Sequence, residues 1–197
     1  MGQYFDNEKL PSKMVKTNAV ILGKRFTFFT DNGVFSKDGL DFGSRLLLET
    51  IPLEEVGGKV LDMGCGYGVF GITLNKILSC SVDMVDVNLR ALHLSEINAK
   101  ENQCSNVRIF ESFTYSNIDS KYTSIVTNPP IRAGKKVVFE ILEKAKDYLN
   151  DSGEIWVVIR KNHGADSAKK KLIEVYGNCD CMKKDKGFYI LKSTKIN

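Results

Sequence analysis

The chain has 197 residues, of which 43% are hydrophobic and 26% are charged, and its formal net charge is +4. This length is sufficient for the core of one domain, and no apolar run is long enough to span a membrane. The N-terminus lacks the basic and apolar regions of a signal peptide, and five cysteines without a paired C-x-x-C spacing are typical of reduced thiols. We therefore expect a cytoplasmic protein without disulfides.

Turn residues and hydrophobic spacing predict a β-hairpin near the N-terminus, with strands at residues 18–22 and 25–30 around Gly23-Lys24. Asp41 is expected to cap the helix that follows. The remaining predicted elements are strands at 60–63, 82–86, 107–111, 123–127 and 154–160, helices at 69–79, 88–102, 135–149 and 165–176, and hairpin strands at 178–183 and 187–192 with a turn across 184–186.

This alternation predicts an α/β fold with a doubly wound, Rossmann-like, mostly parallel seven-stranded sheet. An antiparallel C-terminal hairpin completes the predicted sheet, and an N-terminal β-hairpin is predicted as an extension that precedes the core. We expect a single domain over residues 1–197, with the hairpin and helix extension in residues 1–50 and the core in residues 51–197.

A glycine-rich turn follows the first strand of the predicted core. Asp62 ends that strand, and Gly64, Gly66 and Gly68 follow it at alternate positions, where glycine lets the backbone approach a ligand closely. Asp86 ends the next strand about twenty residues later, the spacing at which a carboxylate meets the ribose hydroxyls of an adenine nucleoside. This pattern predicts a site for a cofactor that contains adenosine.

Two cofactors fit the pattern, because residues 66–71 also match the dinucleotide fingerprint G-x-G-x-x-G. The pyrophosphate of a dinucleotide would be repelled by Asp62. S-adenosylmethionine instead carries an ammonium and a sulfonium, which a carboxylate attracts. We therefore expect S-adenosylmethionine rather than NAD.

The segment Asn128-Pro129-Pro130 follows the predicted strand at residues 123–127. The Asn128 side chain and the Pro129 backbone each offer a carbonyl oxygen, and the proline rings restrict the φ angles of the segment. Two converging acceptors can hold both hydrogens of an NH2 group, so that the nitrogen lone pair points toward an electrophilic methyl group. The local alternative is a strand-ending turn, because Asn and Pro also favour turns. The glycine loop on the same predicted edge of the sheet favours methyl transfer to an amine.

These motifs resemble those of class I amino-methyltransferases. Residues 33–44 and residues 128–136 (NPPIRAGKK) narrow the match, because both segments are similar to the single-domain relatives of the bacterial 16S ribosomal RNA guanine-N2 methyltransferase. The resemblance covers essentially the whole chain. It implies an S-adenosylmethionine-dependent N-methyltransferase that acts on an exocyclic base amine, with guanine N2 in 16S ribosomal RNA as the favoured target. Its partner would be ribosomal RNA or the small ribosomal subunit.

The resemblance also implies roles for individual residues. The catalytic residues would be Asn128, Pro129 and Pro130. The donor-binding residues would be Asp62, Gly64, Cys65, Gly66, Gly68, Asp86, Val87, Phe113 and Asn128, and the substrate-binding residues would be Phe35, Ile131, Arg132 and Lys135. Ile131 departs from the pattern, because many relatives have an aromatic residue there to stack on a flipped-out base. Phe113 also departs from it, because relatives commonly carry an acidic residue at that position for the adenine amino group.

Basic residues follow two strand ends on this predicted edge. Arg132, Lys135 and Lys136 come directly after the Asn-Pro-Pro segment, and Arg160 and Lys161 end the next strand. We expect nucleic-acid phosphates to bind there, although a solvated basic face would have the same composition.

The two histidines, His93 and His163, lack partners at metal-ligand spacing, so no metal is expected and both are interpreted as structural or exposed. Three alternative functions remain open. They are methylation of a protein glutamine, methylation of a DNA amine, and a catalytically inactive RNA module that binds an adenosyl ligand.

Overall fold

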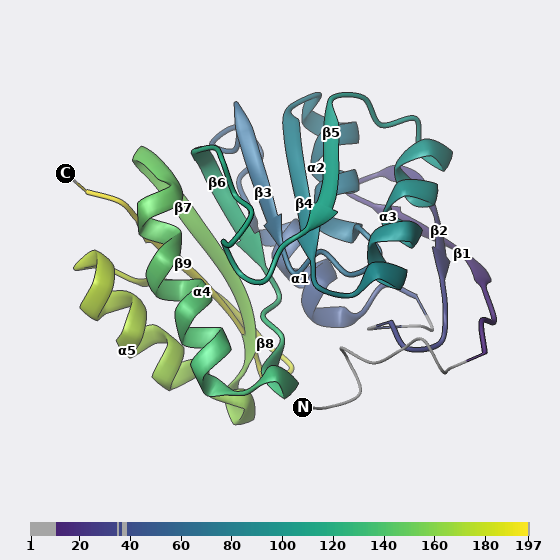
Figure 1. Ribbon diagram of the computed structural model, residues 1–197. Coiled ribbons are helices and arrows are strands. Elements are labelled where there is room, and N and C mark those ends of the chain that lie inside the picture. The colour runs from purple at the N-terminus through teal and green to yellow at the C-terminus, as the bar shows by residue number, and fades with distance from the viewer. Residues whose placement is uncertain (1–10, 35, 37–38, 197) are drawn as a thin grey trace.

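The computed structural model describes residues 11–34, 36 and 39–196, and its centre is a seven-stranded sheet (Figure 1). The strands are β3 (Lys59–Met63), β4 (Ser81–Asp86), β5 (Val107–Glu111), β6 (Tyr122–Thr127), β7 (Leu149–Arg160), β8 (Asp180–Asp185) and β9 (Phe188–Thr194). Their order in the sheet is β5-β4-β3-β6-β7-β9-β8. The first five strands of that order are parallel, and β9 pairs antiparallel with both β7 and β8, which confirms the predicted fold class.

Helices cover both faces of the sheet. The helices are α1 (Phe42–Thr50), α2 (Val69–Leu78), α3 (Leu89–Glu101), α4 (Lys135–Tyr148) and α5 (Ala165–Tyr176), with short 3-10 turns η2 (Ile131–Ala133) and η3 (Lys161–His163). Side chains alternate between the faces along a strand. Val60 therefore packs in the core with α1, α2 and α3, whereas Leu61 packs in the core with α4 and α5.

The order of the strands reverses beside β3. From β3 the chain proceeds through β4 to β5 in one direction, and it then returns to β6 on the other side of β3. Met63 and Thr127 end β3 and β6 as register partners, and the Thr127 hydroxyl donates a hydrogen bond of 2.8 Å to the Met63 carbonyl. Because ligands bind open α/β sheets at such a reversal, the segments that follow these two strands form the expected site.

Both hairpin turns differ from the predicted position. β1 (Val15–Ile21) and β2 (Lys24–Thr30) form a separate two-stranded sheet whose loop is Leu22-Gly23, and the loop between β8 and β9 is Lys186-Gly187. All four loop residues have positive φ, between 43° and 78°. Two-residue loops of this kind match the twist of the strands, and the glycine takes their second position. The prediction misplaced both loops, because it put Gly23 first in one turn and left Gly187 out of the other.

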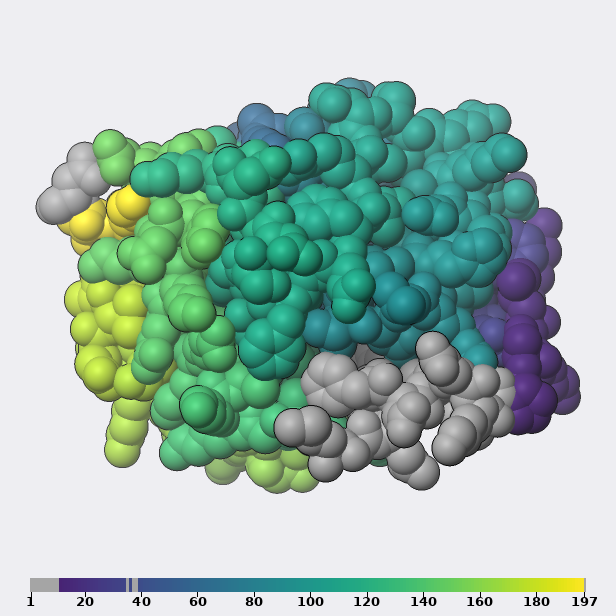
Figure 2. All heavy atoms as spheres, viewed as in Figure 1, coloured from purple at the N-terminus to yellow at the C-terminus, as the bar shows by residue number. Residues whose placement is uncertain are grey.

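The N-terminal hairpin is bound to α3 through side-chain amides. Asn98 accepts a hydrogen bond from the Phe29 amide (2.6 Å) and donates one to the Phe29 carbonyl (3.0 Å). Asn102 makes the same pair of bonds to Thr27, at 3.1 and 2.7 Å. Asn98 also donates to the Tyr67 carbonyl at 2.9 Å, in the loop after β3. In the space-filling view the hairpin lies on the opposite flank from the end of β9 (Figure 2).

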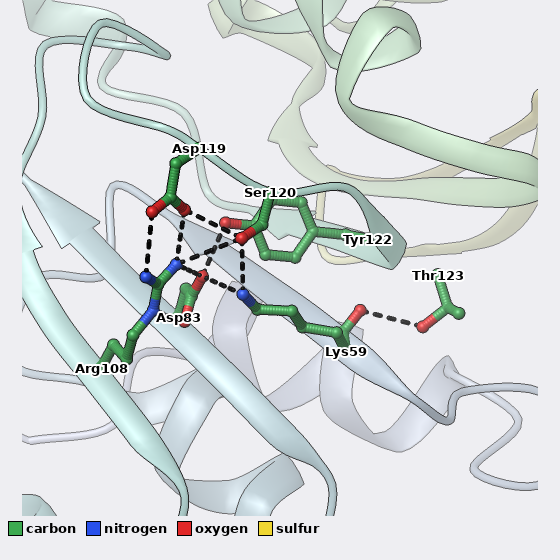
Figure 3. Close-up of polar contacts among 7 residues, drawn as sticks. All are labelled: Lys59, Asp83, Arg108, Asp119, Ser120, Tyr122 and Thr123. Atoms are coloured by element: carbon green, nitrogen blue, oxygen red, sulfur yellow. Dashed lines mark hydrogen bonds and ion pairs between the residues drawn. The ribbon is translucent and has the colours of Figure 1, made fainter.

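A network of charges lies at the amino ends of the parallel strands (Figure 3). The buried Asp83 carboxylate accepts hydrogen bonds from Arg108 (2.6 and 2.8 Å) and the Tyr122 hydroxyl (2.7 Å), and it pairs with Lys59 at 3.0 Å. Arg108 also contacts Asp119 at 2.8 Å. Burial alone would raise the pKa of Asp83, but the hydrogen bonds from its three partners outweigh burial and lower this pKa.

Within the described ranges, no helix is both long and apolar enough to cross a membrane. In the same ranges, no group of three or more His, Cys, Asp or Glu side chains could hold a metal ion.

Candidate active site

A cavity of about 420 Å³ lies at the carboxyl ends of the parallel strands, within the usual size range of small-molecule sites. Predicted residues that line it are Gly64, Cys65, Gly66, Asp86, Val87, Phe113, Asn128, Pro129, Pro130, Ile131 and Arg132. Both predicted motifs therefore face one cavity. Phe35 lies outside the described residues, and Asp62, Gly68 and Lys135 do not line the cavity.

The backbone amides of the glycine loop donate hydrogen bonds to β4. The amides of Gly64 and Cys65 both donate to the Val85 carbonyl at 2.9 Å, and the Gly66 amide donates to the Asp86 carboxylate at 2.9 Å. Gly64 and Gly66 have φ of 73° and 57°, and a Cβ built on either would meet no atom within 4 Å. The loop thus presents bare backbone to open space, as a ligand cradle requires.

Asp86 carries its carboxylate at the cavity wall. It accepts hydrogen bonds from the Gly66 and Asn88 amides, at 2.9 and 3.0 Å. Burial raises the pKa of Asp86, and these backbone hydrogen bonds oppose that shift. Asp86 does not cap the following helix, because the Asn88 side chain caps α3 itself.

Asp62 lies beneath the loop and does not line the cavity, so its role toward the donor stays a prediction. Strand alternation turns Asp62 toward α2, where its carboxylate accepts from the Gly71 amide at 2.9 Å, and Met63 faces the cavity instead. Asp62 is fully buried, and its Oδ1 has no hydrogen-bond partner among the described residues. Burial raises its pKa to about 7, the Gly71 hydrogen bond opposes this, and the charge of Asp86 adds to it.

Gly68 also has a packing role. It begins the α2 turn with φ of 92°, and an added Cβ would lie 2.8 Å from Ile72 Cδ1 and 3.1 Å from Ser95 Oγ. This close approach explains the glycine without a ligand contact. The Cys65 thiol has a pKa raised well above its usual range by burial and by the nearby charges of Asp62 and Asp86, which does not favour a nucleophile.

Asn128 is oriented by a residue that sequence reasoning did not select. Its amide nitrogen lies 3.4 Å from the Ser44 hydroxyl oxygen, and Ser44 also lines the cavity. Asp41 caps α1 as predicted, by accepting a hydrogen bond from the Ser44 amide at 3.0 Å. With its nitrogen directed at Ser44, Asn128 keeps its carbonyl oxygen available as an acceptor. The signal for Ser44 was its place in the 33–44 segment.

Further lining residues were not among the predicted site residues. They include Tyr67 in the glycine loop, together with Phe42, Ile159, Arg160, His163 and Phe188. His163 is exposed, as expected, but it also lies at the cavity. No local pattern identified Phe188, because it reaches the site only through the pairing of β9 with β7.

The basic residues divide into two groups. Arg132 and Arg160 are exposed and line the cavity, and Arg160 also borders an adjoining hollow together with Lys161 and Lys186. Lys135 instead places its ammonium 4.9 Å from the ring centroid of Phe139 on α4. The basic rim, defined here as Arg132, Arg160, Lys161 and Lys186, therefore borders the cavity and the adjoining hollow.

Comparison with known families identifies the site. The family described as "Methyltransferase small domain" matches residues 25–192. The chain belongs to this family. Membership confirms the predicted methyltransferase class, for which S-adenosylmethionine is the methyl donor.

Three relatives of this small-domain methyltransferase are informative. Uncharacterized protein YbxB of Bacillus subtilis is 47% identical over the whole of both chains. Ribosomal RNA small subunit methyltransferase C of Vibrio parahaemolyticus is 35% identical over 91% of this chain and 53% of its own. The T. thermophilus 16S rRNA N2 methyltransferase RsmC, solved with AdoMet and guanosine, has a TM-score of 0.85 at 26% identity, covering 94% of this chain and 52% of that one. The chain thus spans about half the length of the ribosomal RNA methyltransferases that it matches.

Proposed function

We propose that the protein transfers a methyl group from S-adenosylmethionine to an exocyclic base amine, and that guanine N2 in 16S ribosomal RNA is its target. The observation that carries this proposal is the placement of Asn128-Pro129-Pro130 beside the glycine loop, on strands joined at Met63 and Thr127. The relatives that act on 16S ribosomal RNA support the choice of substrate.

The cavity has features that suit the donor. Gly64 and Gly66 leave open space above the loop, and Asp86 offers a carboxylate for ribose hydroxyls. Asp62 adds an incompletely paired carboxyl group below the loop, on the side where the donor's cationic end would lie. Phe113 is 47% exposed at the cavity and can pack against the adenine ring. When bound, S-adenosylmethionine supplies a methyl group activated by positively charged sulfur.

The Asn-Pro-Pro segment prepares the amine. The carbonyl oxygens of Asn128 and Pro129 accept its two hydrogens, which directs the nitrogen lone pair toward the donor side of the cavity. The N–CH3 bond forms as the S–CH3 bond breaks, and S-adenosylhomocysteine leaves as the product. The methylated amine then loses its extra proton to solvent. This chemistry needs no strong base, so catalysis rests on proximity, on orientation and on removal of the base from its stack.

The basic rim supports a nucleic-acid substrate over a protein glutamine. Its four residues border the cavity or the adjoining hollow, where they can attract phosphates that flank a flipped-out base. Retention of the protein on RNA should accordingly weaken as salt is raised.

The decisive experiment supplies tritiated S-adenosylmethionine together with undermethylated small ribosomal subunits, extracted ribosomal RNA, DNA or total protein in separate reactions. We expect label in RNA, recovered after digestion as N2-methylguanosine. Label in DNA or in protein glutamine would keep the chemistry and replace the substrate. Donor binding without transfer to any of the four would support the inactive binding module.

A further inference from the structure

We propose that Phe188, together with the guanidinium of Arg160, forms the surface on which the target base stacks. The inference rests on the proposed function, because it assumes a flipped-out base as substrate. Ile131 occupies the position where many relatives carry an aromatic residue, and it has no π-face to offer. Phe188 and Arg160 would supply that face from other strands.

The two side chains form one unit in the cavity wall. Phe188 is 9% exposed and begins β9, and the Arg160 guanidinium carbon lies 4.5 Å from the centroid of its ring. Phe42 adds a second ring 5.8 Å away, inclined by 49°. All three residues line the cavity. Unstacked bases commonly bind to aromatic rings and to the planes of arginine guanidinium groups.

Sheet order places this unit on the acceptor side of the site. The donor-side segments follow β3, β4 and β5, and the Asn-Pro-Pro segment follows β6. Beyond β6, β7 ends at Arg160 and the antiparallel β9 begins at Phe188, and these two residues are register partners. A base whose amine is held by Asn128 would therefore extend toward Phe188, away from the donor.

Gly43 gives an independent reason to regard the ring position as specific. An added Cβ on Gly43 would lie 2.5 Å from Cε1 and 2.7 Å from Cδ1 of Phe188. Gly43 lies in α1 without a positive φ, so the glycine is needed there for space rather than for backbone conformation. Its neighbour Ser44 contacts Asn128, so α1 positions the Phe188 ring and the Asn128 amide relative to each other.

The test compares Phe188→Leu with Phe188→Tyr, using the RNA substrate that the wild-type chain methylates. Loss of the ring should lower kcat/KM by about tenfold or more, which is the range expected for one base stack. Phe188→Tyr should retain most of the wild-type kcat/KM, and both variants should bind S-adenosylhomocysteine as wild type does. A merely structural role would not separate leucine from tyrosine in this way without also changing donor binding and the thermal unfolding midpoint.

Tyr189→Leu is the matched control. Tyr189 is the next residue of β9, it carries Lys184 4.6 Å from its ring centroid, and it does not line the cavity. This variant should keep wild-type kcat/KM. If Phe188→Leu folds poorly, Arg160→Lys provides the second test, because it keeps the charge and removes the guanidinium plane; a several-fold loss of kcat/KM is expected.

Two results have separate meanings. A wild-type chain that methylates no RNA would contradict the proposed function before any variant is compared. An active wild-type chain whose Phe188→Leu and Arg160→Lys variants keep kcat/KM within about twofold would overturn the stacking inference alone.

Discussion

Two neighbouring strands each carry a completely buried aspartate, and the pKa values of the two carboxyl groups are shifted in opposite directions. On β4, Asp83 has three side-chain partners, and its pKa is lowered. On β3, Asp62 has one backbone partner and one orphaned oxygen, and burial raises its pKa to about 7. A buried polar atom without a partner destabilises a fold, so Asp62 is expected to cost stability that Asp83 does not.

The largest effect is expected at the carboxyl ends of the strands. Asn128→Ala removes an acceptor that orients the amine, and turnover should fall by about a hundredfold or more. Binding of S-adenosylhomocysteine and the unfolding midpoint should change little. Single-turnover transfer of a tritiated methyl group measures the first effect, and calorimetry measures the others.

Ser44→Ala tests the same site with a milder change. It keeps Asn128 but removes the hydroxyl 3.4 Å from its amide nitrogen, so a smaller loss of turnover is expected. Wild-type turnover in Asn128→Ala would refute the role assigned to the Asn-Pro-Pro segment.

Substitutions at the amino ends of the parallel strands should change stability but not turnover. Arg108→Met leaves the buried Asp83 with fewer partners, and the free energy of unfolding should fall by about 3 kcal/mol. Urea unfolding measures this loss, and turnover per folded molecule should stay unchanged. Lys16→Met is the control, because its ion pair with Glu101 is exposed and should contribute much less. Equal losses of unfolding free energy in the two variants would contradict a special structural role for the ion pairs of the buried Asp83.

The pH dependence of stability tests Asp62. Its pKa is near 7 in the fold and near 4 in the unfolded chain, so only the folded chain holds this proton between those values. Its contribution to stability should therefore fall as the pH rises through this window, with a slope of up to about 1.4 kcal/mol per pH unit, and level off above pH 7. Asp62→Asn should remove that slope.

Asp83 should show the opposite sign. Its folded pKa is below the unfolded value, so its contribution is present above about pH 4 and is lost as the pH falls further. Urea titrations of wild type, Asp62→Asn and Asp83→Asn between pH 3 and pH 8 would compare the two residues directly. Parallel curves for wild type and Asp62→Asn between pH 4 and pH 7 would contradict the raised pKa.

The smallest effect is expected at the link between the two motifs. Thr127→Val keeps the shape of the side chain and removes the bond to the Met63 carbonyl, which should cost about 1 kcal/mol of stability. Turnover should fall a few-fold, because the glycine loop and the Asn-Pro-Pro segment are less firmly aligned. Thr50→Val, which removes a local bond within α1, should lower stability without the change in turnover.

Local patterns predicted the parallel part of the fold well. β5 spans the predicted residues 107–111, and the helix capped by Asp41 forms as expected. These features depend on neighbouring residues, which a single sequence displays. The strand at residues 60–63 was predicted from its buried character before a glycine-rich turn, and strand geometry then turns Asp62 and Met63 to opposite faces of the sheet.

Features that depend on strand pairing could not be predicted in this way. Phe188 reaches the cavity because β9 pairs with β7, and no local pattern reveals the order of strands. Ser44 contacts Asn128 across 84 positions of the chain. The sequence thus indicated the glycine loop and the Asn-Pro-Pro segment. The cavity residues Ser44 and Phe188 could be found only from the folded sheet.

Asn98 makes the N-terminal hairpin inseparable from the cofactor loop. One amide group holds both backbone groups of Phe29 and the carbonyl of Tyr67. The region matched by the family begins at residue 25, inside β2, so a fragment cut there would keep Phe29 but lose β1, the strand that pairs with β2. In a chimera of two relatives, the hairpin and the glycine loop should therefore come from the same parent. The junction between the parents should lie before the hairpin rather than between the hairpin and the sheet.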